Sequence, residues 1–533
     1  MTRYAMVADL NRCVGCQTCT ASCKHANNTH PDVQWRKVLD IESGTYPDVR
    51  RTFVPVGCMH CDEPPCMHVC PSTATKKRDD GIVTIDYDLC IGCAYCAVAC
   101  PYQARYKVQQ PRFAYGKNKV MAHEKLRDDP RRLGVAQKCT FCTEKVDLGR
   151  AQGLTPGIDP DATPACVNSC IADALQFGDV EDPKSNVSQL LAENQNFRMH
   201  EDVETGPRFY YLWNSGNTGA DNPAAEPQPG LQADSGAHMI GVAPKLQTHW
   251  DWRAAANFLG GGAGTGLYLA AALAAAFGGM PLLPLAFLAL VLVGLGLFCV
   301  WLEIGRPFRF ANVVLNPNTS WMTREAFVAP LFLGGGFLAI LLSMTWLALL
   351  SAALGMIFLY CQGRILTASK GIPAWREAKL EPLILLTGLT EGTGLLLLGA
   401  AMLPGSGSIF MPAGTALALL ALGRYMAWMA YRRANRATGL PEGAERELGS
   451  LAGMIVYVGT IAPVVLVGIG LALPGYGPYL AGLGGLLAFA TGWWFKYALI
   501  TKAAFDQGFA INHTPARGSG TAGQGVKPGW VHG

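Results

Sequence analysis

The stretch that decides the fold of this chain reads CVGCQTCTASC at residues 13–23, where four cysteines follow the spacing C-x2-C-x2-C-x3-C. The same spacing recurs at residues 90–100, directly before Pro101. Residues 58–70 repeat it with two extra residues before the third cysteine, and a fourth group is split by a loop. Together the four groups contain sixteen of the eighteen cysteines: Cys13, Cys16, Cys19, Cys23; Cys58, Cys61, Cys66, Cys70; Cys90, Cys93, Cys96, Cys100; Cys139, Cys142, Cys166 and Cys170.

Cysteine runs of this spacing are typical of the 4Fe-4S clusters of bacterial ferredoxins. Three closely spaced thiolates hold three corners of a cubane, whereas the fourth cysteine lies one helical turn further on and belongs to a neighbouring cluster. Sixteen thiolates at four per cubane predict four 4Fe-4S clusters. The spacing leaves adjacent and nested pairing of the groups open, because both supply four ligands to each cluster.

Two other uses of grouped cysteines fit less well. Structural zinc prefers two CxxC pairs at a distance, and a C-x2-C-x2-C-x3-C run crowds a tetrahedral site. Disulfides suit small secreted domains, and we expect no secretory signal within Met1–Val7. The pattern therefore favours iron-sulfur clusters.

The composition averages two unlike parts. Half of the 533 residues are hydrophobic and 15% are charged, but the grouped cysteines all lie before residue 171 and nearly all long apolar runs lie after residue 254. A net charge of +4 is too small to indicate a nucleic-acid partner, and we expect none.

We expect four consecutive parts. Residues 1–182 form an α+β ferredoxin-like domain, in which the turn Asp79-Asp80-Gly81 leads into a short strand at 82–85. Residues 183–250, rich in Asn, Pro, Gly and Asp, are predicted to be an extended linker or wrapping arm. An all-α transmembrane domain at 251–503 and a polar tail at 504–533 complete the chain.

The transmembrane domain is predicted from apolar runs of spanning length, which requires about 20 residues each. We count eight helices, although seven is the alternative because the third and fourth runs are nearly continuous. The runs are 254–278, 281–303, 326–343, 346–366, 382–403, 409–430, 452–473 and 477–500. The lipid bilayer is thus an expected partner.

The loop charges predict the orientation in the inner (cytoplasmic) membrane. Loops on the side opposite the N-terminus, around Gly279, Met344, Ser406 and Gly475, carry no Lys or Arg. Under the positive-inside rule, the iron-sulfur domain is then cytoplasmic. Some basic residues could instead serve protein contacts. The basic residues on the N-terminal side are Arg306, Arg309, Arg324, Arg364, Lys370, Arg376, Lys379, Arg432, Arg433, Arg436 and Arg446.

Four motifs in the first part are CVGC at 13–16, CMHCDEPPC at 58–66, CIGC at 90–93 and KCTFC at 138–142. With them, residues 3–180 resemble the four-cluster electron-transfer subunit of molybdopterin oxidoreductases of the dimethyl sulfoxide reductase superfamily. The resemblance implies nested pairing, of the first group with the fourth and of the second with the third. It also implies a molybdopterin-containing catalytic subunit as a partner protein.

The second part resembles the NrfD or polysulfide reductase type of membrane anchor. The motifs that carry this resemblance are Trp252-Arg253-Ala254, Gly260-Gly261-Gly262, Glu303-Ile304-Gly305-Arg306-Pro307, Ser320-Trp321-Met322-Thr323-Arg324-Glu325 and Ile372-Pro373-Ala374-Trp375. In most relatives the two subunits are separate chains, and here they are fused. The resemblance implies a quinone as exchangeable substrate, bound near the start of the first span.

Four residues are candidates for the quinone site. Glu391 lies near the middle of the fifth run, where an ionisable residue is costly and indicates function. Arg424 in the sixth run is its predicted partner, or it snorkels to the surface. His249 and Asn257 lie where the first span begins and are predicted hydrogen-bond partners of a quinone carbonyl.

We therefore expect a non-catalytic electron-transfer and membrane-anchor subunit that links a molybdopterin catalytic subunit to the quinone pool. Complexes with similar parts include sulfite dehydrogenases, reductases of dimethyl sulfoxide or polysulfide, and aromatic acyl-CoA oxidoreductases. The alternatives are an NrfD-type respiratory or ion-translocating module without a molybdenum partner, and a membrane-tethered polyferredoxin. Eight spans exceed what a tether requires, and few protonatable residues in the spans weaken the ion-translocating alternative.

Overall fold

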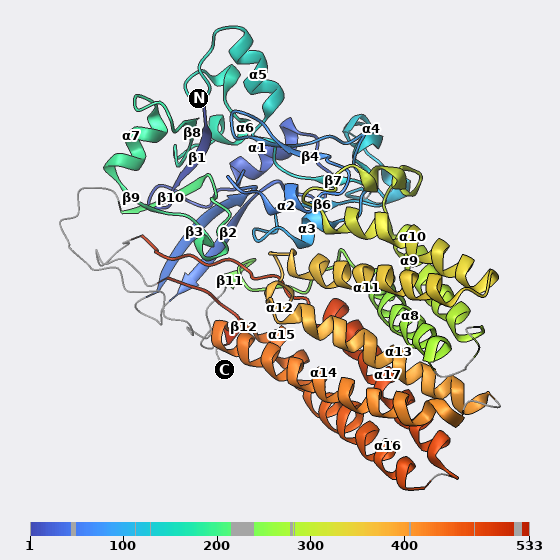
Figure 1. Cartoon of the computed structure of the whole chain (residues 1–533). Helices are drawn as coiled ribbons and strands as arrows, with labels where there is room; N and C mark the ends of the chain where they lie inside the picture. The colour runs from blue at the N-terminus through green and yellow to red at the C-terminus, as the bar shows by residue number, and fades with distance from the viewer. Residues whose placement is uncertain are drawn as a thin grey trace. The chain divides into compact units, whose positions relative to one another are not determined.

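The computed structural model divides the chain into two compact units (Figure 1). The first unit comprises Met1–Lys245 and Asp506–Val531, and the second contains Leu246–Phe505. We describe the units separately. The residues that the structure describes are 2–43, 49–111, 113–127, 129–214, 239–277, 281, 283–403, 407–473, 475–515 and 525–531.

The first unit is built around a four-stranded sheet of order β8-β1-β10-β9. Its centre is the parallel pair β1 (Tyr4–Asp9) and β10 (Phe209–Asn214), and β8 (Leu175–Asp179) runs antiparallel on the other side of β1. β9 (Gln195–Phe197) forms the other edge. β1 is buried along nearly its whole length, as expected of a strand that is covered on both faces.

Three smaller sheets also lie in this unit. One has the order β11-β2-β3, and two are two-stranded, β4-β5 and β6-β7. The short strand expected at 82–85 is present as β5. The bounds are β2 (Arg36–Ser43), β3 (Arg50–Gly57), β4 (Thr75–Lys77), β5 (Val83–Ile85), β6 (Tyr106–Lys107), β7 (Ala136–Gln137) and β11 (Met239–Ile240).

The helices of the first unit are short, and four of them carry grouped cysteines. The structure therefore has the ferredoxin-like α+β character expected from the sequence. The bounds are α1 (Thr18–Ala26), α2 (Pro65–His68), α3 (Tyr95–Val98), α4 (Ala122–Arg127), α5 (Thr143–Ala151), α6 (Ala165–Asn168) and α7 (Asn186–Glu193).

The segment predicted as a linker at 183–250 differs from that expectation in its first part. It forms α7, β9 and β10, and β10 completes the central sheet. Phe209 and Tyr211 on β10 are fully buried, and Tyr211 Oη donates a hydrogen bond to the carbonyl of Pro55 at 3.1 Å. The polar composition of the segment comes mainly from residues 215–238, which lie outside the described residues.

The region predicted as a polar tail also contains packed structure. Asp506–Val531 belongs to the first unit, where Phe509, Ile511 and Val526 enter the hydrophobic core. Asp506 Oδ1 accepts a hydrogen bond from Gln103 Nε2 at 2.8 Å. The tail was predicted to be polar from its average composition, which does not reveal these few core residues.

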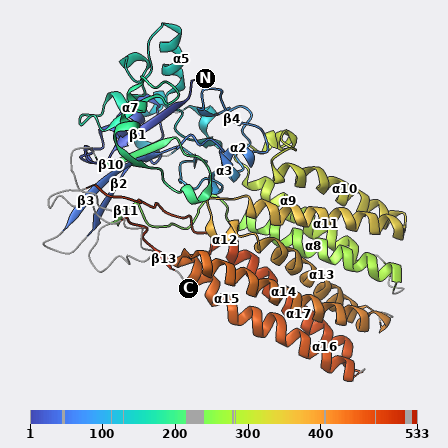
Figure 2. The same ribbon diagram turned by 60° about the vertical axis from the view of Figure 1, so that its left-hand side comes forward.

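The second unit is a helical bundle (Figure 2). Among its described residues, eight helices are long and apolar enough to cross a membrane, as the sequence predicts. They are α8 (Trp252–Phe277), α9 (Leu285–Glu303), α10 (Trp321–Leu341), α11 (Thr345–Thr367), α13 (Leu380–Met402), α14 (Phe410–Thr438), the continuous run of α15 (Glu442–Gly453), the π-helix η7 (Met454–Ile461) and α16 (Ala462–Ala472), and α17 (Gly477–Thr501).

Helices α8 and α13 form the packed centre of this bundle. α8 contacts α9, α11, α13 and α17, and α13 also contacts α14. At the crossing of α8 and α13, a Cβ atom at Gly392 would lie 1.9 Å from the carbonyl carbon of Gly266. Only glycine fits there, and such small residues let membrane helices approach closely.

Gly392→Ala should therefore destabilise the bundle by about 1–3 kcal/mol, because the new methyl group overlaps the backbone of α8. Thermal unfolding of the detergent-purified protein measures the loss. Gly294→Ala on α9 is the matched control, since a Cβ there meets no atom within 4 Å. Equal stability of the two variants would contradict the close approach of α8 and α13.

Candidate functional site

The sixteen grouped cysteines come together in the first unit as four sets of thiols. In each set, the charges of three neighbours act on one member, namely Cys13, Cys23, Cys61 or Cys93. We define set 1 as Cys13, Cys16, Cys19 and Cys170; set 2 as Cys23, Cys139, Cys142 and Cys166; set 3 as Cys58, Cys61, Cys66 and Cys100; and set 4 as Cys70, Cys90, Cys93 and Cys96.

The loops that begin the first and third groups share one backbone geometry. Gly15 and Gly92 have positive φ angles of 70° and 74°, and the residues two positions later, Gln17 and Ala94, have φ of 62° and 59°. This turn brings the N–H of each glycine to the sulfur of the first cysteine in its group. Glycine suits the turn because it adopts positive φ at little cost.

Each set takes three cysteines from one group and its fourth from a second group. In every group, the cysteine that belongs to the neighbouring set lies four residues after a cysteine of the group's own set. On α1, for example, Cys19 belongs to set 1 and Cys23 belongs to set 2. The same step separates Cys66 from Cys70, Cys96 from Cys100, and Cys166 from Cys170. Sets 1 and 2 are thereby joined by two segments of the backbone, and so are sets 3 and 4.

The four sets form one series. Cys166 of set 2 interacts with Cys19 of set 1, and Cys66 of set 3 interacts with Cys96 of set 4. Cys139 of set 2 interacts in turn with Cys58 of set 3. The order is therefore set 1, set 2, set 3, set 4.

The donor chemistry of these sets fits iron. Burial, aided by the charge of neighbouring thiols and opposed by the Gly15 N–H, raises the pKa of the Cys13 thiol to about 11. Burial and the neighbouring Cys66 raise the pKa of the Cys100 thiol to about 12. Four thiolates this close together repel one another, so a cationic centre that deprotonates and bridges them relieves a cost the protein would otherwise carry.

Three buried cations accompany the sets. Arg36 and Lys138 are fully buried, and Arg105 is 3% exposed. Arg105 donates to Cys66 Sγ at 2.8 Å and to Thr75 Oγ1 at 3.1 Å. Lys138 donates to the carbonyl oxygens of Val83 and, at 2.7 Å, Cys139.

In the second unit, Asn257 lies in a buried polar group. Its Nδ2 donates to Glu325 Oε1 on α10 at 3.3 Å, and Gln362 Nε2 on α11 donates to its backbone carbonyl at 3.0 Å. Asn257, Glu325 and Gln362 are each at most 5% exposed. Among the described residues, Asn257 Oδ1 and Gln362 Oε1 have no hydrogen-bond partner.

Glu391 is fully buried, and its partner is Lys496 on α17. Lys496 Nζ lies 2.7 Å from Glu391 Oε2 and also donates to the carbonyl of Phe258 at 2.7 Å. Arg424 instead donates to the carbonyl oxygens of Ala488, at 3.0 Å, and Gly459. Arg424 thus ties α14 to α17 and to the π-helix η7, and it acts on Glu391 only through its charge.

The two polar groups meet at one turn of α8. Gln362 and Lys496 donate to the consecutive carbonyls of Asn257 and Phe258. A Cβ atom would lie 2.2 Å from Gln362 Nε2 at Gly261 and 2.5 Å from Lys496 Nζ at Gly262. These glycines make the room in which both side chains reach α8.

His249 lies in the segment that precedes α8. Its backbone N–H donates to Gln247 Oε1 at 2.8 Å. Gln247 also accepts from the N–H of Trp250, so the segment has a fixed path into α8. Of the four quinone candidates, Asn257 and Glu391 belong to the two polar groups that meet at this turn of α8. Arg424 interacts with Glu391 only through its charge, and His249 lies in the segment before α8.

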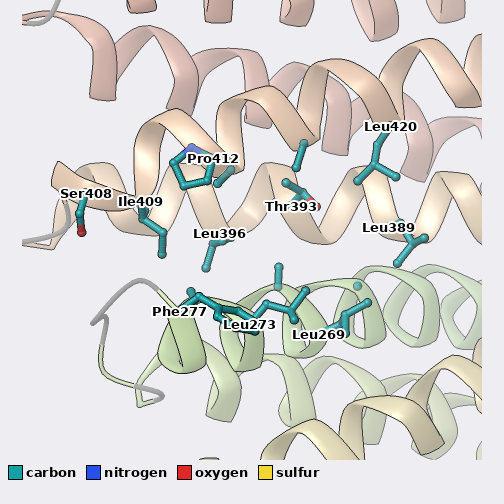
Figure 3. Close-up of a pocket in the computed structure, with 15 residues that line it drawn as sticks. Leu269, Leu273, Phe277, Leu389, Thr393, Leu396, Ser408, Ile409, Pro412 and Leu420 are labelled. Atoms are coloured by element: carbon teal, nitrogen blue, oxygen red, sulfur yellow. The ribbon is translucent and has the colours of Figure 1, made fainter.

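A separate cavity of about 560 Å³ lies among α8, α13 and α14 (Figure 3). Its lining is almost wholly apolar, with Leu269 and Leu273 of α8 facing Leu389 and Leu396 of α13. None of the four quinone candidates lines it. The structure thus offers an apolar space and a polar layer at different places in the bundle.

The fold and site define an iron-sulfur protein of ferredoxin type that is continuous with a membrane bundle. A family model described as a 4Fe-4S dicluster domain matches residues 49–116.

Three similar proteins extend this match. An iron-sulfur subunit from Halobacterium salinarum, named for dimethyl sulfoxide reductase, is 40% identical over 226 residues, covering 40% of this chain and 79% of that protein. A subunit of sulfite dehydrogenase from Allochromatium vinosum is 36% identical over 228 residues, covering 40% and 83%. A subunit of polysulfide reductase from Wolinella succinogenes is 35% identical over 215 residues, covering 40% and 95%.

This protein belongs to the family of iron-sulfur subunits of oxidoreductases of the dimethyl sulfoxide and polysulfide reductase type. It is an electron-transfer protein that carries iron-sulfur clusters, and it is fused to a helical unit whose described residues include eight helices long and apolar enough to cross a membrane. These findings confirm the family and the multi-pass membrane character that the sequence predicts.

The sequence interpretation missed several members of the membrane site. Lys496 lies inside the eighth apolar run, so the rule that singled out Glu391 also points to it. Glu325 stands one residue before the third run, at the end of a motif that carries the resemblance to the membrane anchor. Gln362 is uncharged, and no spacing distinguishes it.

Lys496→Met should destabilise the second unit by about 3–5 kcal/mol, because it leaves the Glu391 carboxylate buried without its cation. Adding Glu391→Gln should recover most of the loss, since no unpaired charge remains. Thermal unfolding of the purified protein in detergent measures both variants. A double variant no more stable than Lys496→Met would show that the pair does not act as a unit.

Proposed function

We propose that this protein is the electron-transfer and membrane-anchor subunit that links a molybdopterin-containing catalytic partner to the quinone pool. The observation that carries the proposal is the single series of four thiol sets in a member of this iron-sulfur subunit family. Such a series passes electrons one at a time between two ends. The relatives' names include sulfite dehydrogenase and polysulfide reductase.

We assign one 4Fe-4S cluster to each thiol set, which gives four clusters with the nested pairing that the family resemblance implies. Sets 1 and 2 combine the first and fourth cysteine groups, and sets 3 and 4 combine the second and third. The charge interactions among the thiols of each set support this assignment. When bound, the clusters supply one-electron transfer, and the protein supplies their spacing and burial.

Single cysteine variants test the pairing. Cys170→Ser should alter the same EPR signal as Cys13→Ser, because both residues belong to set 1. Cys70→Ser should alter the signal that responds to Cys90→Ser, because both belong to set 4. Iron content of about sixteen atoms per molecule is expected for the unmodified protein.

Cys299→Ser is the matched control, since this cysteine lies on α9 outside the four sets and should change no signal. Pairing of Cys170 with Cys139 and Cys142 in one signal would contradict the nested assignment.

The quinone site is proposed at the polar layer around α8. Asn257 Oδ1 and Gln362 Oε1 are buried acceptors with no hydrogen-bond partner among the described residues, and Asn257 Nδ2 is a donor suited to a quinone carbonyl. A quinone takes two protons with two electrons, and Glu325 and Glu391 are the carboxyl groups at hand for them. We assign His249 to the segment through which the quinone would reach this site. We assign Arg424 to the positioning of Glu391 through its charge.

We propose that the iron-sulfur domain faces the cytoplasm of the inner membrane. The basic loop residues support this orientation under the positive-inside rule. Some of them have partners in the second unit: Arg432 Nη1 lies 2.9 Å from Glu445 Oε2, and Arg364 Nη1 lies 3.3 Å from Glu381 Oε2. A cytoplasmic position favours substrate oxidation with quinone reduction.

Asn257→Ala and Glu325→Gln should each slow reduction or reoxidation of the clusters by a quinol analogue at least tenfold in membranes, because the first removes the proposed hydrogen-bond partner of the head group and the second removes a proposed proton-carrying carboxyl group. EPR after rapid mixing measures the rate. Thr415→Ala on α14, an exposed position, is the control that should leave it unchanged.

Ala416→Phe, which fills the apolar cavity, distinguishes the two places in the bundle. A loss of quinol response in this variant, with Asn257→Ala unaffected, would move the quinone site to the cavity. Clusters that ignore quinol in the unmodified protein would overturn the quinone proposal and favour an ion-translocating module. One observation favours an ion-translocating module: Lys496 and Glu325 are buried ionisable residues in addition to Glu391 and Arg424. Only the latter two were counted from the sequence.

A further inference from the structure

Each junction between consecutive thiol sets contains one buried cation. There are three junctions in a series of four sets, and Arg36, Lys138 and Arg105 occupy them in that order. The three side chains come from β2, from the residue before Cys139, and from the residue before β6. They are therefore unrelated in sequence and meet only in the fold.

Arg36 lies at the junction of sets 1 and 2. Its main charge interactions are with Cys166, Cys139 and Cys23 of set 2 and with Cys19 of set 1. Its guanidinium packs 4.8 Å from the centre of the Phe209 ring. Its Nη2 donates to Met6 Sδ at 2.9 Å, and among the described residues Arg36 Nε and Nη1 have no hydrogen-bond partner.

Lys138 and Arg105 occupy the next two junctions. The main charge partners of Lys138 are Cys58 and Cys66 of set 3 and Cys139 of set 2. Arg105 interacts with three members of set 3 and with Cys96 of set 4. Its hydrogen bond to Cys66 Sγ places one guanidinium nitrogen directly on a thiol of set 3.

The charge balance of these cations is unusual for a protein interior. In the described part of the chain, none of the three forms an ion pair with Asp or Glu. A buried cation without an anion is strongly disfavoured, so it requires negative charge nearby. The thiolates and the clusters they would hold are the anions within reach.

We propose that Arg36, Lys138 and Arg105 are potential-setting residues, and that each one raises the reduction potentials of the two clusters on either side of it. The proposal rests on the proposed function, because it assumes a 4Fe-4S cluster in each set. Reduction adds one negative charge to a cluster, and a fixed cation in a low-dielectric site stabilises that charge.

A cation at a junction acts on two clusters, whereas a cation beside a single cluster acts on one. Adjacent clusters repel each other's added electron, and a cation between them attracts the electron on either side. One electron can then pass from a cluster to its neighbour with little change in its interaction with the shared cation. Each residue thus stabilises an added electron on both sides of its junction, which favours transfer across it.

The test is an EPR-monitored redox titration of the full-length protein in detergent, with each signal assigned through the cysteine variants. Arg36→Gln should lower the potentials of the set 1 and set 2 clusters and leave the other two unchanged. Lys138→Met should lower sets 2 and 3, and Arg105→Gln should lower sets 3 and 4. We expect at least a tenfold fall in the reduced-to-oxidised ratio at fixed ambient potential, which is about 59 mV for one electron.

Charge-conserving variants and a surface arginine provide the controls. Arg36→Lys, Lys138→Arg and Arg105→Lys should restore most of each shift, which a purely structural role would not do. Arg51→Gln removes an arginine that is 57% exposed on β3 and should move no signal. If one neutral variant fails to bind iron, the other two junctions still predict their own pairs of signals.

Two failures are distinguishable. An unmodified protein with fewer than four one-electron clusters would overturn the proposed function itself. Four clusters with normal iron content whose potentials ignore all the neutral variants, or shift without the pairwise pattern, would overturn only the role of the junction cations.

Discussion

The first unit depends on a step of four residues. A cysteine at position i completes one thiol set, and the cysteine at i+4 enters the next set, so two sets must be neighbours. This occurs at Cys19 and Cys23, and again in the three other groups. The pairing of distant segments, such as α1 with the loop after β7, follows from that local geometry. Because the thiolates of neighbouring sets lie close together, the buried cations Arg36, Lys138 and Arg105 lie beside them.

The sequence predicted those features of the fold that depend on residues close together in the chain. The cysteine groups, the strand at 82–85 and the eight apolar helices all depend on spacing within a short window. β10 was missed because Phe209–Trp213 acquires its partner β1 from the opposite end of the first unit's sequence, and long-range pairing leaves no local signal. The buried residues Phe509, Ile511 and Val526 were hidden in the same way by a polar average.

The membrane site shows a similar limit. An ionisable residue in an apolar run is visible in the sequence, so Glu391 could be found, but its partner could not be chosen from spacing. Arg424 was the plausible cation, and the fold selected Lys496 because Gly262 on α8 and Gly492 on α17 leave room for the Lys496 and Glu391 side chains. Arg424 satisfies backbone carbonyls next to a π-helix, where the altered hydrogen-bond pattern leaves acceptors to be filled.

The two units balance buried charge in different ways. In the second unit, the anion of Glu391 and the cation of Lys496 come from the same chain, so the bundle can fold with its own side chains. In the first unit, Arg36, Lys138 and Arg105 face buried thiols, and no carboxylate among the described residues pairs with these cations. Neutral thiols would leave the cations uncompensated, and thiolates without iron would repel one another. Both costs fall when iron-sulfur clusters form, so folding of this unit and insertion of its clusters are thermodynamically coupled.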